Sequence, residues 1–272
     1  FFDTANLYSA GSSEEIVGKA LKDFANRDEI VLASKLYFPM FEGPNAKGLS
    51  RKSIFAEIDH SLKRLQTDYL DLYIIHRWDY DTPIEETMEA LHDLVKMGKV
   101  RYIGASSMHG WQFAKAQFIA EKNGWTKFVS MQNLYNLLYR EEEREMIPLL
   151  QDQKVAMTPW SPLAGGRLTR DIGAITARAS QAVEADLPAY IVASDNEVIS
   201  RVHKLADERG ITRGQVATAW MLSKDYVTAP LSCATKVKYL DDALGAFEIA
   251  LSAEEIKYLE ESYVPRNITG YR

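Results

Sequence analysis

Four ionisable residues, Asp3, Tyr8, Lys35 and His76, stand at or just after the ends of short apolar segments. A phenol, with a reference pKa of about 10, is a weak acid for protonating a carbonyl oxygen at neutral pH, but a nearby ammonium stabilises the phenolate. Lys35 could supply that charge, and Asp3 could be the counterion that a buried lysine requires. His76 could donate a hydrogen bond to the same substrate oxygen and orient it. The set predicts a proton-delivery site without a metal or a covalent nucleophile, and its natural partner is hydride transfer to a carbonyl.

Each of these four residues also has a structural interpretation when it is considered alone. An aspartate at a strand end often caps a helix, a tyrosine can lie on a rim, and a lysine can be a solvated loop charge. A lone histidine after an apolar strand is more often a hydrogen-bonded structural residue. Their shared placement after successive apolar segments favours the chemical interpretation.

The segments that must position these residues alternate between short apolar and longer amphipathic patterns. The clearest apolar one is Leu70–Ile75, which is rich in β-formers and too short for a typical helix. Six further strands are expected at Phe1–Asp3, Ile30–Ser34, Val100–Ala105, Phe128–Gln132, Val155–Trp160 and Val227–Ser232. Helices are expected from Ser12 (as cap) to Phe24, from Ser50 to Leu65, from Pro83 to Met97, and over His109–Lys122, Glu141–Leu150, Asn196–Arg209, Thr212–Ser223, Val237–Phe247 and Ala253–Tyr263. This alternation indicates a parallel sheet wrapped by helices.

The fold class that this order favours is an α/β (β/α)8 TIM barrel. Such barrels place their chemistry at the carboxyl ends of the strands, where the four ionisable residues lie. Seven strands are one short, so we expect one barrel domain over residues 1–272 whose first βα unit is absent from this chain. An open doubly wound sheet is the alternative. The segment Thr169–Ser194 lacks a pattern and is expected to be a long loop.

Composition excludes several classes of function. The 272 residues are 46% hydrophobic and 26% charged, with a formal net charge of -6 and with Lys and Arg spread along the chain. No basic cluster suggests nucleic acid, and no apolar run reaches the roughly 20 residues that span a bilayer. The lone Cys233 excludes an internal disulfide and a cysteine-based metal site, which fits a reducing cytoplasm. We therefore expect a cytoplasmic protein with no nucleic-acid or membrane partner.

Motifs spread over residues 1 to about 250 resemble those of the aldo-keto reductases. Those around the four ionisable residues are Phe2-Asp3-Thr4-Ala5 with Tyr8, Lys35 closing a strand, and Asp68-Tyr69-Leu70-Asp71-Leu72 running into His76. Downstream motifs are Gly98-Lys99-Val100-Arg101-Tyr102-Ile103-Gly104-Ala105-Ser106-Ser107, Met131-Gln132-Asn133 and Pro159-Trp160-Ser161-Pro162-Leu163-Ala164-Gly165-Gly166. Within the family the chain is most similar to the aryl-alcohol-dehydrogenase-like and potassium-channel-β-subunit-like branch.

The resemblance implies a role for each matching residue. It makes Asp3, Tyr8, Lys35 and His76 catalytic, and it assigns Trp160 to stack on a nicotinamide ring, although Trp160 could instead be a core aromatic. The implied contacts with the nicotinamide carboxamide are Ser106, Ser107 and Gln132. The implied pyrophosphate contacts are Ser161, Leu163, Gly165, Arg167 and Arg170, beneath a flap formed by Thr169–Ser194.

The match is weaker where the adenosine would bind. Thr235 and Lys236 could bind a 2′-phosphate, Tyr239 could stack on adenine and Asp242 could accept a hydrogen bond from its amino group. Ala243 stands where the family usually has an asparagine. We expect NADP(H), mainly from Lys236, while NAD(H) stays open because a lysine at a helix start can simply be solvated.

The resulting hypothesis is an NADP(H)-dependent carbonyl reductase or alcohol dehydrogenase in which Tyr8 supplies the proton. Four aromatic residues, Tyr37, Phe38, Trp78 and Tyr80, are expected to line the pocket and to favour aromatic or apolar aldehydes and ketones. One alternative is a nucleotide-sensing regulatory subunit with incidental turnover, and another is a catalytically inactive truncated relative. The sequence leaves homo-oligomerisation open.

Overall fold

The computed structural model describes residues 1–174 and 192–271. The chain divides into two compact units, Phe1–Met131 and Gln132–Arg272, which we call unit 1 and unit 2 and describe separately. One barrel domain over the whole chain stays a prediction. Among the described residues, no helix has both the length and the apolar character needed to cross a bilayer.

The strands of unit 1 follow one another in the sheet in the order in which they occur along the chain. Strands β1 to β4 pair in parallel. A doubly wound sheet would reverse its strand order at one point, and this order has no reversal. The predicted α/β class with a parallel sheet is confirmed, while the described part of the chain contains six strands and does not reach eight. They are β1 (Phe2–Asp3), β2 (Leu32–Leu36), β3 (Leu70–Ile75), β4 (Val100–Ser106), β5 (Phe128–Gln132) and β6 (Ala156–Met157).

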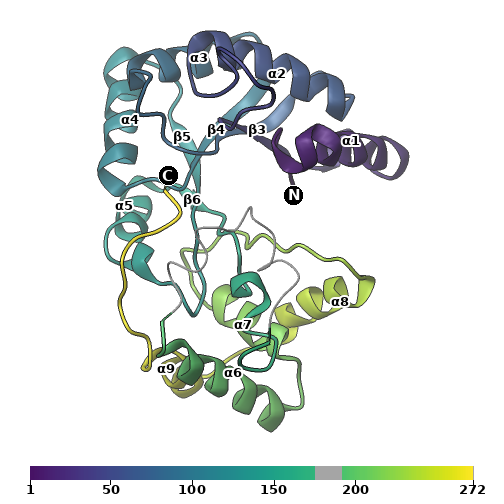
Figure 1. Ribbon diagram of the computed structural model, residues 1–272, viewed down its shortest axis with the longest axis vertical. Coiled ribbons are helices and arrows are strands. Elements are labelled where there is room, and N and C mark those ends of the chain that lie inside the picture. Colours follow the sequence, from purple (N-terminus) through teal and green to yellow (C-terminus); the bar gives the residue numbers. More distant parts are fainter. Residues whose placement is uncertain (175–191, 272) are drawn as a thin grey trace. The chain divides into compact units, whose positions relative to one another are not determined.

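The helices of unit 1 are α1 (Ser12–Phe24), α2 (Arg51–Leu65), α3 (Ile84–Lys96) and α4 (Gly110–Asn123), and each packs beside the next (Figure 1). Helix α1 approaches α2 so closely that a Cβ at Gly18 would lie 2.5 Å from the Leu65 carbonyl oxygen. The expectation that Ser12 caps α1 was wrong. Gly11 is the cap, with φ +96°, a conformation that glycine adopts without the cost of a Cβ, and the Ser12 hydroxyl donates back to the Ser9 carbonyl.

The helices in the described part of unit 2 are α5 (Met146–Gln153), α6 (Asp195–Arg209), α7 (Arg213–Leu222), α8 (Val237–Gly245) and α9 (Ala253–Glu260). Helix α6 packs on α7 and α9, and α7 packs on α8. The helix expected over Glu141–Leu150 begins instead as a single 3-10 turn, Glu141–Glu143, before α5 starts.

The strand expected at Val227–Ser232 was wrong, and β6 is shorter than the expected Val155–Trp160. These two segments do run side by side, since the backbone N–H of Thr228 donates to the Met157 carbonyl and that of Leu231 to the Pro159 carbonyl. Each segment contains a proline, which has no N–H to donate to a ladder. The pairing is therefore reduced to an isolated parallel bridge between Met157 and Val227.

Candidate active site

Three of the four ionisable residues contact one another inside unit 1. Lys35, in β2, is completely buried, and its ammonium donates to an Asp3 carboxylate oxygen. The same Nζ lies 2.9 Å from the Thr4 carbonyl oxygen and 3.3 Å from the Tyr8 hydroxyl. The parallel pairing of β1 with β2 produces this meeting, because Asp3 stands opposite Ala33, two residues before Lys35. The geometry joins the phenol, the ammonium and the carboxylate in one network.

Charge attraction keeps Lys35 protonated in spite of its burial. Burial by itself would lower the pKa of this ammonium, because desolvation disfavours the charged form. Attraction to Asp3 and Tyr8 and the hydrogen bonds to both outweigh burial, so that the pKa of Lys35 is raised above its usual value. A full positive charge therefore stands beside the Tyr8 oxygen at neutral pH.

His76 follows β3 and faces the same tyrosine. Its ring centroid lies 5.8 Å from that of Tyr8, and the two rings meet edge to face at 76°. Burial, followed by repulsion from Lys35 and Arg77, lowers the pKa of His76 well below its usual value, so the imidazole is neutral at pH 7. Its Nδ1 is buried and has no hydrogen-bond partner among the described residues. A neutral imidazole can donate from one nitrogen to a substrate oxygen.

The predicted pocket aromatics do not all gather at His76. Phe38 does, with its centroid 5.1 Å from the His76 ring, and Tyr37 packs against Phe38 at 5.2 Å. Trp78 is buried and its ring lies 6.1 Å from that of Trp111. Tyr80 is exposed, and its hydroxyl accepts a hydrogen bond from Gln112 at 3.1 Å.

Two neighbours of these aromatics were missed by the sequence analysis. The Arg77 guanidinium lies 5.4 Å from the centroid of Phe38, a distance that permits a cation–π contact. Its position next to His76 was the available signal. Trp111 is brought to Trp78 by the start of α4, and no local pattern in the sequence links the two.

The candidate cofactor residues of unit 1 are Ser106, the last residue of β4, and Ser107. Both are buried, and their hydroxyl oxygens lie 3.1 Å apart. Ser107 has φ +50°, in the left-handed region that costs a residue with a Cβ roughly 1–2 kcal/mol. Ser9 and Ala10, directly after Tyr8, share this conformation. Backbone strain of this kind clusters at functional sites in proteins.

In unit 2, the candidate residue Gln132 is the last residue of β5, and Trp160 follows β6. Gln132 is buried at the end of β5. The Trp160 backbone N–H donates to the Asn133 carbonyl at 3.0 Å, and the partly buried indole packs against Leu134 and Tyr139. The neighbouring Ser161 is held at φ +60° while its carbonyl accepts a hydrogen bond from Asn136 at 3.0 Å.

The loop after Trp160 carries the candidate pyrophosphate residues. Leu163 precedes a short 3-10 turn, and Gly165 within that turn has φ +64°. Arg167 directs a guanidinium nitrogen at Asp195, the buried first residue of α6, at 2.8 Å, whereas Arg170 is exposed. Most of the predicted flap, residues 175–191 of Thr169–Ser194, lies outside the described residues.

The candidate adenosine residues lie at and before the start of α8. Thr235, Lys236 and Tyr239 are exposed, and Asp242 is half-buried. Lys236 stands at the cap position of α8 with its backbone extended. This arrangement leaves the side chains accessible to a ligand and equally accessible to solvent.

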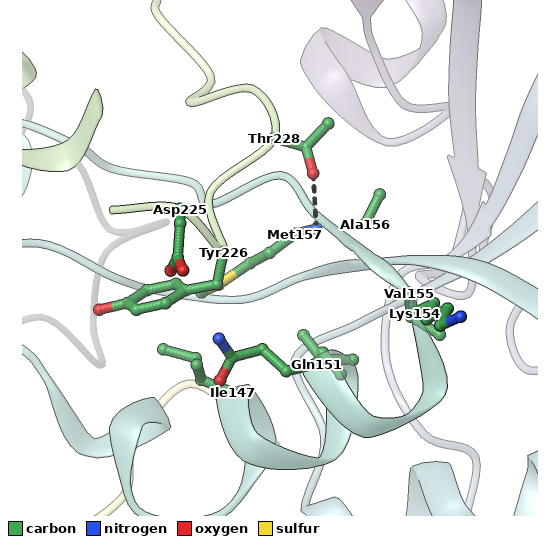
Figure 2. Close-up of a pocket in the computed structure, with 10 residues that line it drawn as sticks. Ile147, Gln151, Lys154, Val155, Ala156, Met157, Asp225, Tyr226 and Thr228 are labelled. Atoms are coloured by element: carbon green, nitrogen blue, oxygen red, sulfur yellow. Dashed lines mark hydrogen bonds between the residues drawn. The ribbon is translucent and has the colours of Figure 1, made fainter. Parts of the chain in front are cut away.

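A pocket of about 490 Å³ in unit 2 is lined by none of the predicted residues. Its walls are α5, the start of β6 and the segment around Tyr226, whose side chain faces Ile147 and Gln151 (Figure 2). The pocket lies at the amino end of β6, whereas Trp160 and Ser161 follow its carboxyl end. The pocket and the candidate site residues Trp160 and Ser161 therefore lie at opposite ends of β6.

Comparison with known proteins identifies the family of this chain. A model of the aldo/keto reductase family matches residues 1–264. This chain belongs to the aldo/keto reductase family, as its motifs indicated.

Relatives in fungi extend this finding. The versiconal hemiacetal acetate reductase of Aspergillus parasiticus is 45% identical over 289 residues, covering 98% of this chain and 83% of the relative. A Schizosaccharomyces pombe relative whose name contains "aryl-alcohol dehydrogenase" is 46% identical over 297 residues, covering 99% and 82%. The aldo-keto reductase AFTS1 of Alternaria alternata is 44% identical over 294 residues, covering 99% and 80%. Family and relatives together support an oxidoreductase with carbonyl reductase activity.

Proposed function

We propose that this protein is an NADP(H)-dependent carbonyl reductase, and in reverse an alcohol dehydrogenase, acting on aldehydes or ketones. The observation that carries the proposal is the contact of the Tyr8 hydroxyl with a buried, charged Lys35 that is itself paired with Asp3. Relatives whose names contain "reductase" or "dehydrogenase" support the same proposal. The proposed fold of the whole enzyme is the eight-stranded barrel.

Each residue of the network has a distinct part in the proposed reaction. Tyr8 gives its hydroxyl proton to the oxygen of the carbonyl as that oxygen gains charge. Lys35 stabilises the phenolate that Tyr8 forms when it loses this proton. Asp3 orients the Lys35 ammonium and balances its charge. Neutral His76 donates a hydrogen bond to the carbonyl oxygen, which fixes it near the phenol. The aromatic rings of Phe38 and Tyr37 exclude water on one side of His76.

The chemistry of the side chains in unit 2 fits a nicotinamide nucleotide. Gln132 offers an amide, Trp160 a flat ring, and Arg167 a guanidinium already oriented by Asp195, which suits a phosphate oxygen. Small residues at left-handed positions, Ser161 and Gly165, would let a ligand approach the backbone closely. When bound, the nucleotide supplies or accepts the hydride of the reaction.

Replacing Tyr8 by Phe tests the proposal. We expect the kcat for reduction of an aromatic aldehyde to fall by about 100-fold or more, because general acid catalysis contributes roughly 10²–10⁴. The affinity for NADPH, measured by quenching of tryptophan fluorescence, should stay unchanged. Tyr102→Phe is the matched control, since Tyr102 is also an exposed tyrosine of unit 1 and has no proposed role.

Two outcomes contradict the proposal in different ways. A Tyr8→Phe protein that keeps full reductase activity removes Tyr8 as the proton donor. A parent protein that binds NADPH tightly but turns over no aldehyde or ketone in a broad screen points to the nucleotide-sensing alternative.

A further inference from the structure

The segment Tyr263–Tyr271 lies beside Trp160, which we call the candidate nicotinamide platform of unit 2. Gly270 has φ +82°, and a Cβ built there would lie 3.6 Å from Cζ2 and 3.9 Å from Cη2 of Trp160. A side chain at position 270 would therefore touch the edge of the indole ring, so the segment passes close to Trp160. Nearby, the Thr269 N–H donates to the Tyr139 hydroxyl at 3.2 Å, and Tyr139 belongs to the cluster on which Trp160 packs.

The residue after Gly270 fastens this segment to a buried carboxylate. The Tyr271 hydroxyl donates to Oε1 of Glu142 at 2.5 Å, and Asn133 Nδ2 donates to Oε2 of the same carboxylate at 2.5 Å. Asn133 Nδ2 also lies 3.3 Å from the Tyr271 hydroxyl oxygen. The three side chains are 8%, 2% and 0% exposed for Tyr271, Glu142 and Asn133, so solvent cannot easily replace a lost partner.

Asn133 connects this network to Trp160. Its side chain bonds to Glu142, while its carbonyl oxygen accepts the hydrogen bond from the Trp160 N–H at 3.0 Å. Asn133 also directly follows Gln132, the candidate carboxamide residue. A shift of Asn133 would therefore move the backbone under both proposed nicotinamide contacts.

The same segment contains a second tyrosine–glutamate pair that provides a natural comparison. The Tyr263 hydroxyl donates to Glu141 at 2.6 Å and accepts from the Arg140 N–H at 3.0 Å. Tyr263 thus binds the neighbouring glutamate but bonds neither to Asn133 nor to Trp160 in the described contacts. Removal of the Tyr263 hydroxyl should therefore loosen the segment without displacing Trp160.

We propose that Tyr271 is a positioning residue, whose hydroxyl, through Glu142 and Asn133, fixes the backbone that carries Trp160 and the indole on which the nicotinamide rests. Gly270, directly before Tyr271, is the point at which this segment passes the ring edge. The part that concerns the nicotinamide rests on the proposed function, whereas the support of Trp160 does not.

The first experiment uses the full chain without any cofactor. Trp160 is one of five tryptophans, so its emission is obtained as the difference between each protein and the same protein with Trp160→Phe. We expect Tyr271→Phe to raise the acrylamide quenching constant of Trp160 by about twofold, because the buried hydrogen bond that holds this segment is lost. Tyr263→Phe should leave it unchanged. Equal quenching in the parent and Tyr271→Phe proteins would overturn the proposal.

Glu142→Gln is the second variant, in case Tyr271→Phe folds poorly. An amide has one acceptor oxygen and one donor group, so either Asn133 or Tyr271 loses its acceptor. We expect the same rise in Trp160 quenching, and an unchanged constant would again count against the proposal.

The second experiment adds turnover and a double-mutant cycle. Tyr271→Phe should lower the kcat with NADPH about three- to tenfold, and this loss should vanish in a Trp160→Ala background, because coupled residues are not additive. A loss of the same size in both backgrounds would mean that Tyr271 acts elsewhere. If the parent shows no turnover, the proposed function fails, while the quenching result still decides whether Tyr271 supports Trp160.

Discussion

The candidate catalytic residues Asp3, Lys35 and Tyr8 of unit 1 are joined directly through Lys35, whereas those of unit 2 are held by groups with no proposed ligand contact. Asp3, Lys35 and Tyr8 form one buried network. Arg167 is instead oriented by Asp195, and Trp160 by the Asn133 carbonyl. Proton transfer requires the participating groups to be in contact. In unit 1 the fold brings these groups into contact without a ligand. The proposed nucleotide-binding residues need only be accessible to a ligand. Each of them is held in position by its own neighbouring residues.

The largest effect should come from removing one partner of the network in unit 1. Lys35→Met leaves Asp3 without its ammonium in a site where the paired carboxylate is only 10% exposed. We expect a loss of about 3–5 kcal/mol in the free energy of unfolding, measured with urea, together with loss of reductase activity. Lys99→Met is the control, since its pair with Asp59 lies at the surface, and it should cost less than about 1 kcal/mol. Similar losses in the two variants would contradict a buried network.

Glu142 of unit 2 and His76 of unit 1 should contribute to stability with opposite dependence on pH. Burial, opposed by hydrogen bonds from Tyr271 and Asn133 and assisted by repulsion from Glu141 and Glu145, raises the pKa of Glu142 to about 7. The folded state thus keeps this proton between the ordinary pKa of 4.5 and about 7, so unit 2 loses stability, up to about 3 kcal/mol, as pH rises through that range. His76 has a lowered pKa, so only the unfolded state takes up its proton below about 6.5, and unit 1 loses stability as pH falls.

Hydrogen exchange between pH 5 and 8, read separately for each unit, measures this difference. Glu142→Gln should flatten the response of unit 2 alone, and His76→Asn that of unit 1 alone. A parallel response of both units in the parent protein would contradict the assignment of these two groups.

The smallest effect should come from the exposed end of the proposed nucleotide site. Lys236→Met should weaken NADPH binding about fivefold, because an exposed ammonium is screened by solvent, and should leave NADH binding unchanged. Fluorescence titration with both nucleotides measures this. Equal weakening of NADPH and NADH would show that Lys236 does not select a 2′-phosphate, and Lys238→Met on the same helix is the control.

Features set by short stretches of sequence could be predicted. The apolar segment before His76 forms β3 with the predicted bounds, and α2 starts one residue after the predicted Ser50, whose side chain caps it. Lys35 was placed at a strand end and lies within β2, one residue from its last residue. These features depend on periodicity and capping, which act within a few residues.

Features set by distant residues could not be predicted. Tyr271 and Glu142 are 129 positions apart, and Tyr271 and Asn133 are 138 apart, so no period in the sequence connects them. The missing strand at Val227–Ser232 has another cause, because its apolar composition was outweighed by the proline within it. Binding of a nucleotide by the predicted cofactor residues stays a prediction. Loops that are held only by neighbouring residues and loops that bind a ligand can have the same geometry.

The close approach of α1 to α2 at Gly18 restricts which sequences can encode this site. The obstacle to a side chain there is the Leu65 backbone carbonyl, which cannot rotate aside as a side chain would. Every substitution, alanine included, must separate two helices, and α1 directly follows the turn that carries Tyr8. Mutational libraries aimed at new carbonyl substrates should therefore hold Gly18 constant and vary positions around Phe38, whose ring contacts His76.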